Sequence, residues 1–298
     1  MRHHLKRLQQ KSAARLHAAK EKLAAFRIYN LASYALNRAT PRQGYQLKTD
    51  LAYGDAVRQK LDLYLADQKH AKKPLLVFVH GGAWSTGDKS SYRFFGQAFA
   101  SQGFDVAVIN YHLAPEYIYP ASVNDLALAL NFLHDQQEAL QVSTEHVILM
   151  GHSAGAFNVM SVLYSAQQHV ITCFDNILAV IGLAGPYHFD YKGDPLCQHA
   201  FDQTVSYRDV MPYYFVEQNN IQHYLFRAAN DTVVGAYNAD DLQTVLHQVG
   251  NHCEIIEIAK TGHVTLVGSL AHWFQRYFRT YHEVSAVLKR SLADQVRD

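Results

Sequence analysis

The sequence predicts an α/β fold in which a mostly parallel sheet of eight strands carries helices on both faces. From about residue 45 onward, short apolar runs alternate with segments of helical periodicity, a pattern typical of parallel sheets flanked by helices. The chain of 298 residues, with 49% hydrophobic side chains, is long enough for one large core. It has no run of 18 or more apolar residues, so we expect no transmembrane helix.

Each strand is expected where apolar residues run together or alternate, and each helix where they recur every three or four positions. The expected strands lie near residues 45–53, 59–65, 75–80, 105–110, 146–150, 177–182, 222–229 and 253–258. The expected helices lie near residues 89–102, 121–138, 154–167, 237–249 and 265–290. Only the short segment YGDAVRQ separates the first two strands, so we expect them to form an antiparallel hairpin at a sheet edge.

Residues 1–40 differ from the rest of the chain, 41–298, in charge. They carry nine Lys or Arg and a single acidic residue, Glu21, whereas the rest carries 18 Lys or Arg and 25 acidic residues. Apolar residues recur at helical spacing there, which predicts a basic amphipathic helical segment. Three roles stay open: a helix packed on the domain, a peripheral contact with an anionic membrane, or an organelle presequence. No apolar stretch follows the basic residues, so we expect no secretory signal.

Cysteine and histidine usage indicates a chain without disulfides or metal. The three cysteines are far apart and odd in number, which favours a reducing compartment, and we expect a cytoplasmic protein. The 18 histidines are scattered, and we expect no metal and no cofactor. With a net charge of +1, we expect no nucleic-acid partner.

The segment VILMGHSAGAFNVMSVL, residues 147–163, carries the first chemical signal. It reads as a buried strand, then Gly-His-Ser-Ala-Gly, then a helix of small and apolar residues. This is the G-x-S-x-G motif in the strand–turn–helix context that it requires. The tight turn exposes Ser153 at a helix N-terminus, where free N–H groups favour developing negative charge. We therefore predict that Ser153 is a nucleophile rather than a plain helix cap.

A serine nucleophile needs a base to accept its proton and an acid to orient that base. In enzymes with this turn, the acid and then the base follow the serine along the chain. Asp231 comes just after a predicted strand, and His263 lies in a glycine-containing loop after the next one. The competing residues lie within helices or at the opposite sheet edge: Asp240, Asp241, His247, His252 and His272. We predict Asp231 as the acid and His263 as the base.

The stretch HGGAWSTGDK, residues 80–89, leaves a predicted strand through a turn that is nearly free of side chains. An attacked carbonyl develops an oxyanion, which preorganised N–H groups stabilise. We expect those donors from Gly81, Gly82 and Ala83, together with Ala154 directly after the serine. His80 is expected to support the loop.

The substrate pocket is expected from aromatic residues. Between residues 186 and 220 the periodicity is lost and aromatics accumulate, which predicts a lid-like insertion or binding loop. We expect Tyr187 and His152 to contact the substrate. Trp84 has two open roles, as a wall of the acyl pocket or as an anchor of its own loop.

Four segments together resemble the HGG-containing, hormone-sensitive-lipase-like branch of the α/β-hydrolases: HGGAWSTGDKSSY, NYHLAPEYIYPASVNDLALALNFL, GHSAGA and GLAGPYHF. The likeness covers residues 45–280 and is greatest to bacterial esterases related to feruloyl and acetyl-xylan esterases and to arylformamidases. It implies the same triad and oxyanion residues in a catalytic domain, 41–298. His112 stands where the family commonly has arginine, so a salt bridge to Glu116 or Asp125 is expected to be weaker. Arylformamidases tend to have a bulkier aromatic at the position of Ala83.

These observations predict a serine carboxylic-ester hydrolase that acts on small acyl or aryl esters through an acyl-enzyme. An arylformamidase-like amide hydrolase with the same triad is the close alternative. A ligand receptor on the same fold is the third, because a fold alone does not establish catalysis. The expected partner is a small-molecule ester, and the oligomeric state stays open.

Overall fold

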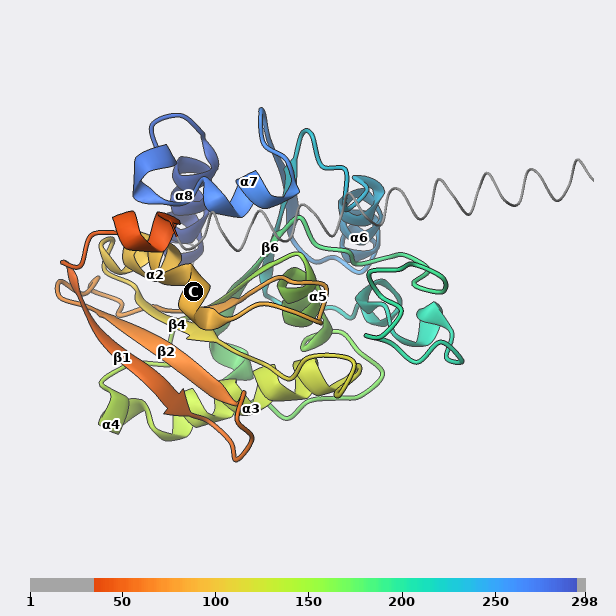
Figure 1. Ribbon diagram of the computed structural model, residues 1–298, viewed down its shortest axis with the longest axis horizontal. Helices are drawn as coiled ribbons and strands as arrows, with labels where there is room; N and C mark the ends of the chain where they lie inside the picture. The colour runs from red at the N-terminus through yellow and green to blue at the C-terminus, as the bar shows by residue number, and fades with distance from the viewer. Residues whose placement is uncertain (1–34, 294–298) are drawn as a thin grey trace, which may run out of the picture.

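The structure, a computed structural model, describes residues 35–293, and it is for these residues that the fold is given. The predicted basic amphipathic segment, residues 1–40, therefore lies mostly outside the described residues. Its last part, residues 35–39, forms a helical turn, drawn red-orange in Figure 1. The expectation for residues 1–34 stays a prediction.

One sheet of eight strands runs through the fold, as predicted (Figure 1). Its order is β1-β2-β4-β3-β5-β6-β7-β8, and only β2 runs opposite to its neighbours, so β1 and β2 form the expected antiparallel hairpin at one edge. The strands are β1 (Tyr45–Ala52), β2 (Lys60–Ala66), β3 (Leu75–Val79), β4 (Asp105–Ile109), β5 (Val147–His152), β6 (Ile177–Leu183), β7 (Gln222–Ala228) and β8 (Cys253–Ile258).

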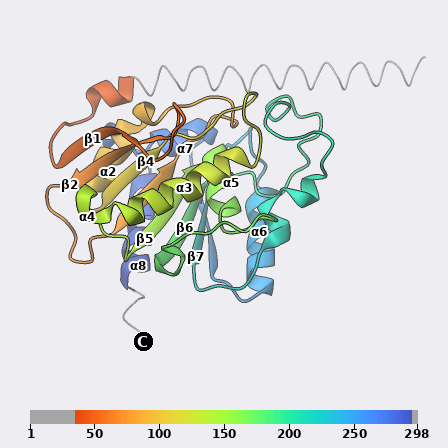
Figure 2. The ribbon, with the colours of Figure 1, turned by 90° about the horizontal axis from the view of Figure 1, so that it is seen from below.

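Helices cover both faces of the sheet, as Figure 2 shows. Successive residues of β3 enter different cores: Leu75 and Val77 pack on one face, Leu76 and Phe78 on the other. This alternation is what a strand buried on both faces requires. One face carries α3 (Ala121–Asp135), α4 (Gln137–Leu140), α5 (Ala154–Ser161) and α6 (Tyr237–Gln248), and the other carries α2 (Arg93–Ala100), α7 (His263–Gly268) and α8 (Thr280–Ala293).

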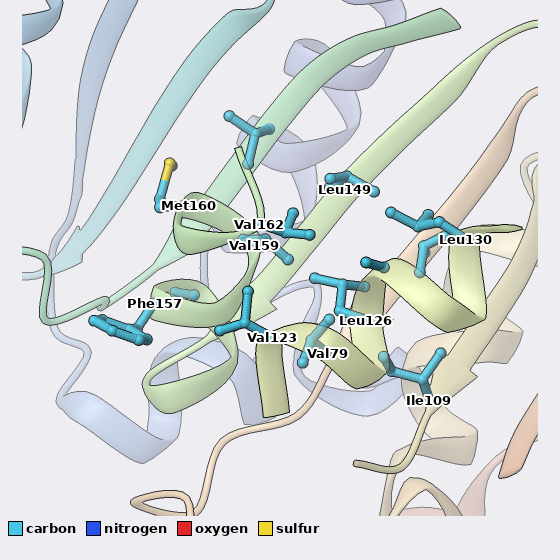
Figure 3. Close-up of a cluster of buried hydrophobic side chains, with 14 of the residues drawn as sticks. Val79, Ile109, Val123, Leu126, Leu130, Leu149, Phe157, Val159, Met160 and Val162 are labelled. Atoms are coloured by element: carbon cyan, nitrogen blue, oxygen red, sulfur yellow. The ribbon is translucent and has the colours of Figure 1, made fainter. Parts of the chain in front are cut away.

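The first of these cores fixes the helix that follows the serine (Figure 3). Phe157 and Val159 of α5 pack in the same cluster as Val123 and Leu126 of α3 and Leu149 of β5, and all five are fully buried. Burial of such side chains contributes on the order of 2 kcal/mol each. The position of α5, and with it the turn before α5, is therefore set by a large apolar contact.

Two predicted helices differ from the structure. The expected helix 265–290 is broken into α7, a 3₁₀ turn (His272–Phe274) and α8. The break follows Gly268, and the Ser269 hydroxyl donates to the Leu266 carbonyl, a bond that competes with the helix ladder. The expected helix 154–167 ends at Ser161, and the chain then turns so that the Tyr164 hydroxyl meets His223 Nε2 at 2.7 Å in the interior.

The parallel strands place the loops after β3, β5, β7 and β8 at one edge of the sheet, because their carboxyl ends all point the same way. Between β6 and β7 the chain forms only short 3₁₀ turns, Tyr207–Asp209 and Pro212–Phe215. All three cysteines are free and buried: Cys173, Cys197 and Cys253. Within residues 35–293, no helix is both long and apolar enough to span a bilayer.

Candidate active site

Ser153 occupies a strained turn between β5 and α5. Its φ and ψ are 54° and −119°, a combination that a residue with a side chain rarely adopts. The turn is possible because its neighbours are small: a Cβ on Gly155 would lie only 2.0 Å from the Val79 carbonyl oxygen. The two glycine positions of the motif are thus explained by the backbone of the adjoining strand and helix. Strain of this kind is characteristic of functional sites.

A chain of hydrogen bonds joins three of the predicted side chains. His263 Nε2 lies 2.9 Å from Ser153 Oγ, and His263 Nδ1 lies 2.8 Å from Asp231 Oδ2. Ser153 and His263 are each only 5% exposed. The structure therefore brings these three residues together, although more than a hundred positions separate the first from the last. The order is that of a nucleophile, a base and an orienting acid.

Asp231 is held as a carboxylate by its surroundings. Burial acts to raise its pKa, but the hydrogen bond from His263 and the backbone N–H groups of Val234 and Val233 more than offset this, and the pKa lies below its ordinary value. A carboxylate fixed in this way keeps Nδ1 of His263 protonated and leaves Nε2 as the acceptor toward Ser153.

The turn after β3 approaches the serine closely. A Cβ on Gly81 would lie 3.1 Å from Ser153 Cβ, so only glycine leaves space there. The Gly82 carbonyl accepts hydrogen bonds from the Ser85 and Thr86 N–H groups, each at 3.0 Å, which closes the turn. Within residues 35–293, the hydrogen bonds leave the N–H groups of Gly82, Ala83 and Ala154 without an acceptor. They are three of the four donors that the sequence predicts for an oxyanion; the fourth, Gly81, is the residue that leaves space beside Ser153.

His80 lies beneath this turn. Its Nδ1 donates to the Gly81 carbonyl oxygen at 2.8 Å, and its ring stacks on Tyr111 with 4.4 Å between centroids. Full burial lowers the pKa of His80 to about 4, so the imidazole is neutral at physiological pH. The Tyr111 hydroxyl donates to the His80 carbonyl at 2.9 Å. These contacts are those of a support for the loop.

Trp84 both anchors its loop and lines a cavity next to Ser153. Its indole Nε1 donates to Asn158 Oδ1 at 3.0 Å, and its ring meets Phe201 edge-on with 4.7 Å between centroids. The cavity has a volume of about 140 Å³. Its lining is mainly apolar and comes from Ala83, Trp84, Pro186, Phe189, Asp194, Leu196, Cys197, Val233, Val234, Gly235, Tyr237 and Asn238. Such a volume matches that of a cavity able to hold one benzene ring, roughly 150 Å³.

His152 and Tyr187, the other two predicted substrate contacts, lie outside the lining of this cavity, although Tyr187 lines a second cavity of about 100 Å³ together with Asp231. Both are buried, at 2% and 1% exposure, and neither lines the cavity beside Ser153. His152 Nε2 instead donates to the backbone carbonyl of His263 at 3.0 Å, which ties the base to the strand that carries the serine. Burial, and secondarily the neighbouring His263, lower the pKa of His152 to about 3. Tyr187 packs against Gly182 and Gly185 in the core.

One polar residue of this region was missed by sequence reasoning. Asn158 is fully buried in α5 and accepts hydrogen bonds from Trp84 Nε1 and from the Ser122 hydroxyl. The available signal was a lone amide within an otherwise small and apolar helix, because a buried polar group needs partners.

His112 substitutes for the arginine expected at its position without loss of the contact. Its Nδ1 lies 2.8 Å from Asp125 Oδ2, and its backbone N–H donates to the same oxygen at 2.6 Å. Within residues 35–293, no group of three His, Cys, Asp or Glu side chains is arranged to hold a metal ion.

A family model, BD-FAE, matches residues 61–246 of the chain. Among curated proteins, the chain is similar to isoprenylcysteine alpha-carbonyl methylesterase ICME of Arabidopsis thaliana, with 31% identity over 153 residues, which are 49% of this chain and 36% of that protein. It is also similar to kynurenine formamidase of Drosophila melanogaster, with 32% identity over 150 residues, 50% of this chain and 48% of that protein. The chain thus spans less than half of the length of either relative.

Solved structures share the fold. Esterase B from Lactobacillus rhamnosis superimposes with a TM-score of 0.73 and 19% identity, covering 94% of this chain and 95% of that one. A truncated carbohydrate esterase from gut microbiota has a TM-score of 0.67 and 16% identity, covering 85% of this chain and 99% of that one. At these identities the likeness establishes the α/β-hydrolase fold.

Proposed function

The chain belongs to the BD-FAE family of α/β-hydrolases, and on this premise we propose that it hydrolyses small carboxylic esters with Ser153 as nucleophile, His263 as base and Asp231 as orienting acid. The single observation that carries the proposal is the hydrogen-bond chain from Ser153 Oγ through His263 to Asp231, at 2.9 and 2.8 Å. It lies beside the turn after β3, in which the Gly82 and Ala83 N–H groups have no acceptor among the described residues.

The reaction follows from this arrangement. His263 Nε2 takes the Ser153 proton as Oγ attacks the ester carbonyl, and the oxyanion accepts hydrogen bonds from the backbone of Gly82, Ala83 and Ala154. The protonated imidazole, stabilised by Asp231, then gives its proton to the departing alcohol, and an acyl-serine is left. Water, deprotonated by the same Nε2, releases the acid and restores the serine. Loss of one oxyanion donor lowers the rate of such a reaction on the order of 10²–10³-fold.

The substrate class is proposed from the cavity. About 140 Å³ beside Ser153 accommodates a short acyl chain or one aromatic ring, and the walls formed by Trp84, Phe189 and Leu196 are apolar. The methylesterase similarity agrees with an ester of a small group, and the small side chain of Ala83 favours ester over formamide. The formamidase similarity makes amide cleavage the second candidate, because the same three residues can serve it.

The test compares esters of graded acyl length with a formamide. Purified full-length chain should hydrolyse p-nitrophenyl acetate and butyrate with kcat/KM well above that for the octanoate, and above that for N-formylkynurenine. A preference for N-formylkynurenine would reverse the order of the two candidates.

Labelling identifies the nucleophile independently of substrate. A fluorophosphonate probe should label the chain, and Ser153→Ala should abolish labelling. Ser165→Ala, which removes a partly exposed serine hydroxyl that donates to the Gln167 carbonyl, should label like the parent. Folded protein that takes no label would favour the receptor alternative.

A further inference from the structure

Three large aromatic side chains are exposed on the loop that joins α7 to α8. The loop, residues 269–279, is called the aromatic loop here, and its Trp273, Phe274 and Tyr277 are 57%, 40% and 63% exposed. Apart from the adjacent pair Tyr117 and Ile118, the other exposed large hydrophobic residues of the described chain are single in sequence: Val57, Leu128, Val170, Val205 and Tyr237. Single exposed residues are ordinary, but three within five positions form a patch that indicates an interaction.

Arginines accompany these aromatics. The Arg276 guanidinium carbon lies 4.6 Å from the Tyr277 ring centroid, and Arg279 forms an ion pair with Glu283 one helical turn further on. The loop is therefore both aromatic and cationic. This combination is typical of surfaces that meet the headgroup region of a bilayer, where amphipathic rings and basic side chains are both favourable.

The aromatic loop contacts the point at which the basic N-terminal segment joins the fold. The Trp273 indole N–H donates to the Ala39 carbonyl at 3.2 Å, which brings the exposed Arg38 next to the loop. Figure 1 shows the red-orange turn 35–39 and the blue loop on the same side of the molecule. In sequence, residues 1–34 carry eight Lys or Arg and one acidic residue, so the chain that enters here is strongly cationic.

A cationic cleft adjoins the same N-terminal segment that the aromatic loop contacts. It has a volume of about 1080 Å³ and lies between the 37–42 segment, β1, β2 and the start of α2. Three carboxylates line it, from Asp50, Asp62 and Asp88, against six cationic side chains, from Arg38, Arg42, Arg58, Lys60, Lys89 and Arg93. The excess of positive charge makes this face complementary to an anionic surface.

We propose that this face, consisting of the aromatic loop, Arg38 and Arg42, docks on the surface of an anionic lipid bilayer. The aromatic rings enter the headgroup region, and the arginines bind lipid phosphates. The proposal does not depend on the reaction at Ser153, since none of these residues lines the cavity beside that serine.

The intrinsic tryptophan fluorescence of the chain can report on the aromatic loop. It has two tryptophans, and Trp84 is 5% exposed whereas Trp273 is 57% exposed. A change in emission on adding vesicles therefore reports on the aromatic loop. With the full-length chain and phosphatidylcholine vesicles containing phosphatidylglycerol, we expect co-sedimentation and a blue shift of the emission. Both should weaken with added salt and be absent with phosphatidylcholine alone.

Point variants test whether the aromatic loop, rather than another part of the chain, makes the contact with the vesicle. Trp273→Phe should remove the blue shift while binding stays within a few-fold, because an aromatic ring is retained. Arg276→Gln should weaken binding about fivefold, the equivalent of about 1 kcal/mol. Arg208→Gln removes an exposed arginine that also lies over a tyrosine ring, and it serves as the matched control with unchanged binding.

Three results would overturn the proposal. Vesicle binding of the full chain without any emission shift would mean that residues outside the aromatic loop make the contact. An equal shift with soluble polyphosphate or heparin would mean that the face binds soluble anions or nucleic-acid-like polymers rather than a bilayer. Absence of vesicle binding at low salt would also dismiss it.

Discussion

Three buried histidines make the stability of the fold depend on pH above the range in which carboxylates titrate. Burial, as the largest cause in each case, lowers the pKa of His80 to about 4, of His152 to about 3 and of His223 to about 4. In the unfolded chain an imidazole titrates near its ordinary pKa of about 6.5. Between these values the unfolded state binds protons that the folded state does not, so acid favours unfolding.

The magnitude follows from linkage. Between pH 7 and pH 5 each of the three imidazoles removes about 2 kcal/mol from the free energy of unfolding, or on the order of 5 kcal/mol together. The stabilisation is complete above pH 7 and declines as the pH falls through 6.5. Carboxylates with lowered pKa values, such as Asp231, stabilise the fold throughout this range, and their contribution is lost only as the pH falls below about 4. A native stability of about 5–15 kcal/mol would thus be substantially reduced at pH 5.

Urea unfolding followed by circular dichroism at pH 7, 6 and 5 measures this decline. His223→Gln should reduce the decline by about a third, even though the loss of its bonds to Tyr164 and His252 lowers stability at every pH. His282→Gln is the matched control, because this imidazole is already exposed in the folded chain. A free energy of unfolding that stays constant within about 1 kcal/mol between pH 7 and 5 would refute the reasoning.

Three further outcomes are expected at the site. Asp231→Asn should lower kcat about 10⁴-fold with little change in melting temperature, because the amide favours the wrong tautomer of His263. Steady-state kinetics on a short ester measure this loss, and a loss below tenfold would contradict the prediction. Gly155→Ala should destabilise the fold by at least about 4 kcal/mol, because its Cβ would lie 2.0 Å from the Val79 carbonyl, and soluble expression with parental stability would disprove it. Trp84→Phe should lower the free energy of unfolding by about 1–3 kcal/mol, because Asn158 Oδ1 loses its indole donor. Thermal unfolding measures this loss, and an unchanged midpoint would show that the bond is dispensable.

The sheet was predictable because its signals are local. Buried strands such as 75–79 and 105–109 are recognisable in the sequence as short, mostly apolar runs. The glycines around Ser153 are required by the backbone of a tight turn that involves only a few residues. Strand order then placed the loops containing Asp231 and His263 at the same edge. Sequence reasoning could bring these residues to that edge, and the structure adds the distances between their atoms.

The errors concern side-chain direction and helix ends. His152 is adjacent to Ser153 in sequence, but its strand position turns the imidazole inward, toward the His263 carbonyl, and adjacency carries no information about this. The break after Gly268 depends on the Ser269 hydroxyl, which also meets Thr280 Oγ1 at 2.6 Å, a contact between segments that periodicity cannot show. In both cases a contact with another segment of the chain determines the local structure.

The wall of the cavity and the three residues of the proposed triad are built from different parts of the chain. Ser153, Asp231 and His263 follow strands of the sheet, whereas Phe189 and Leu196 come from the stretch between β6 and β7 that has no regular ladder of its own. Replacing residues in that stretch changes the wall of the cavity while the strands of the sheet keep their register. Divergence or laboratory selection can therefore retune which esters are accepted without rebuilding the chemistry.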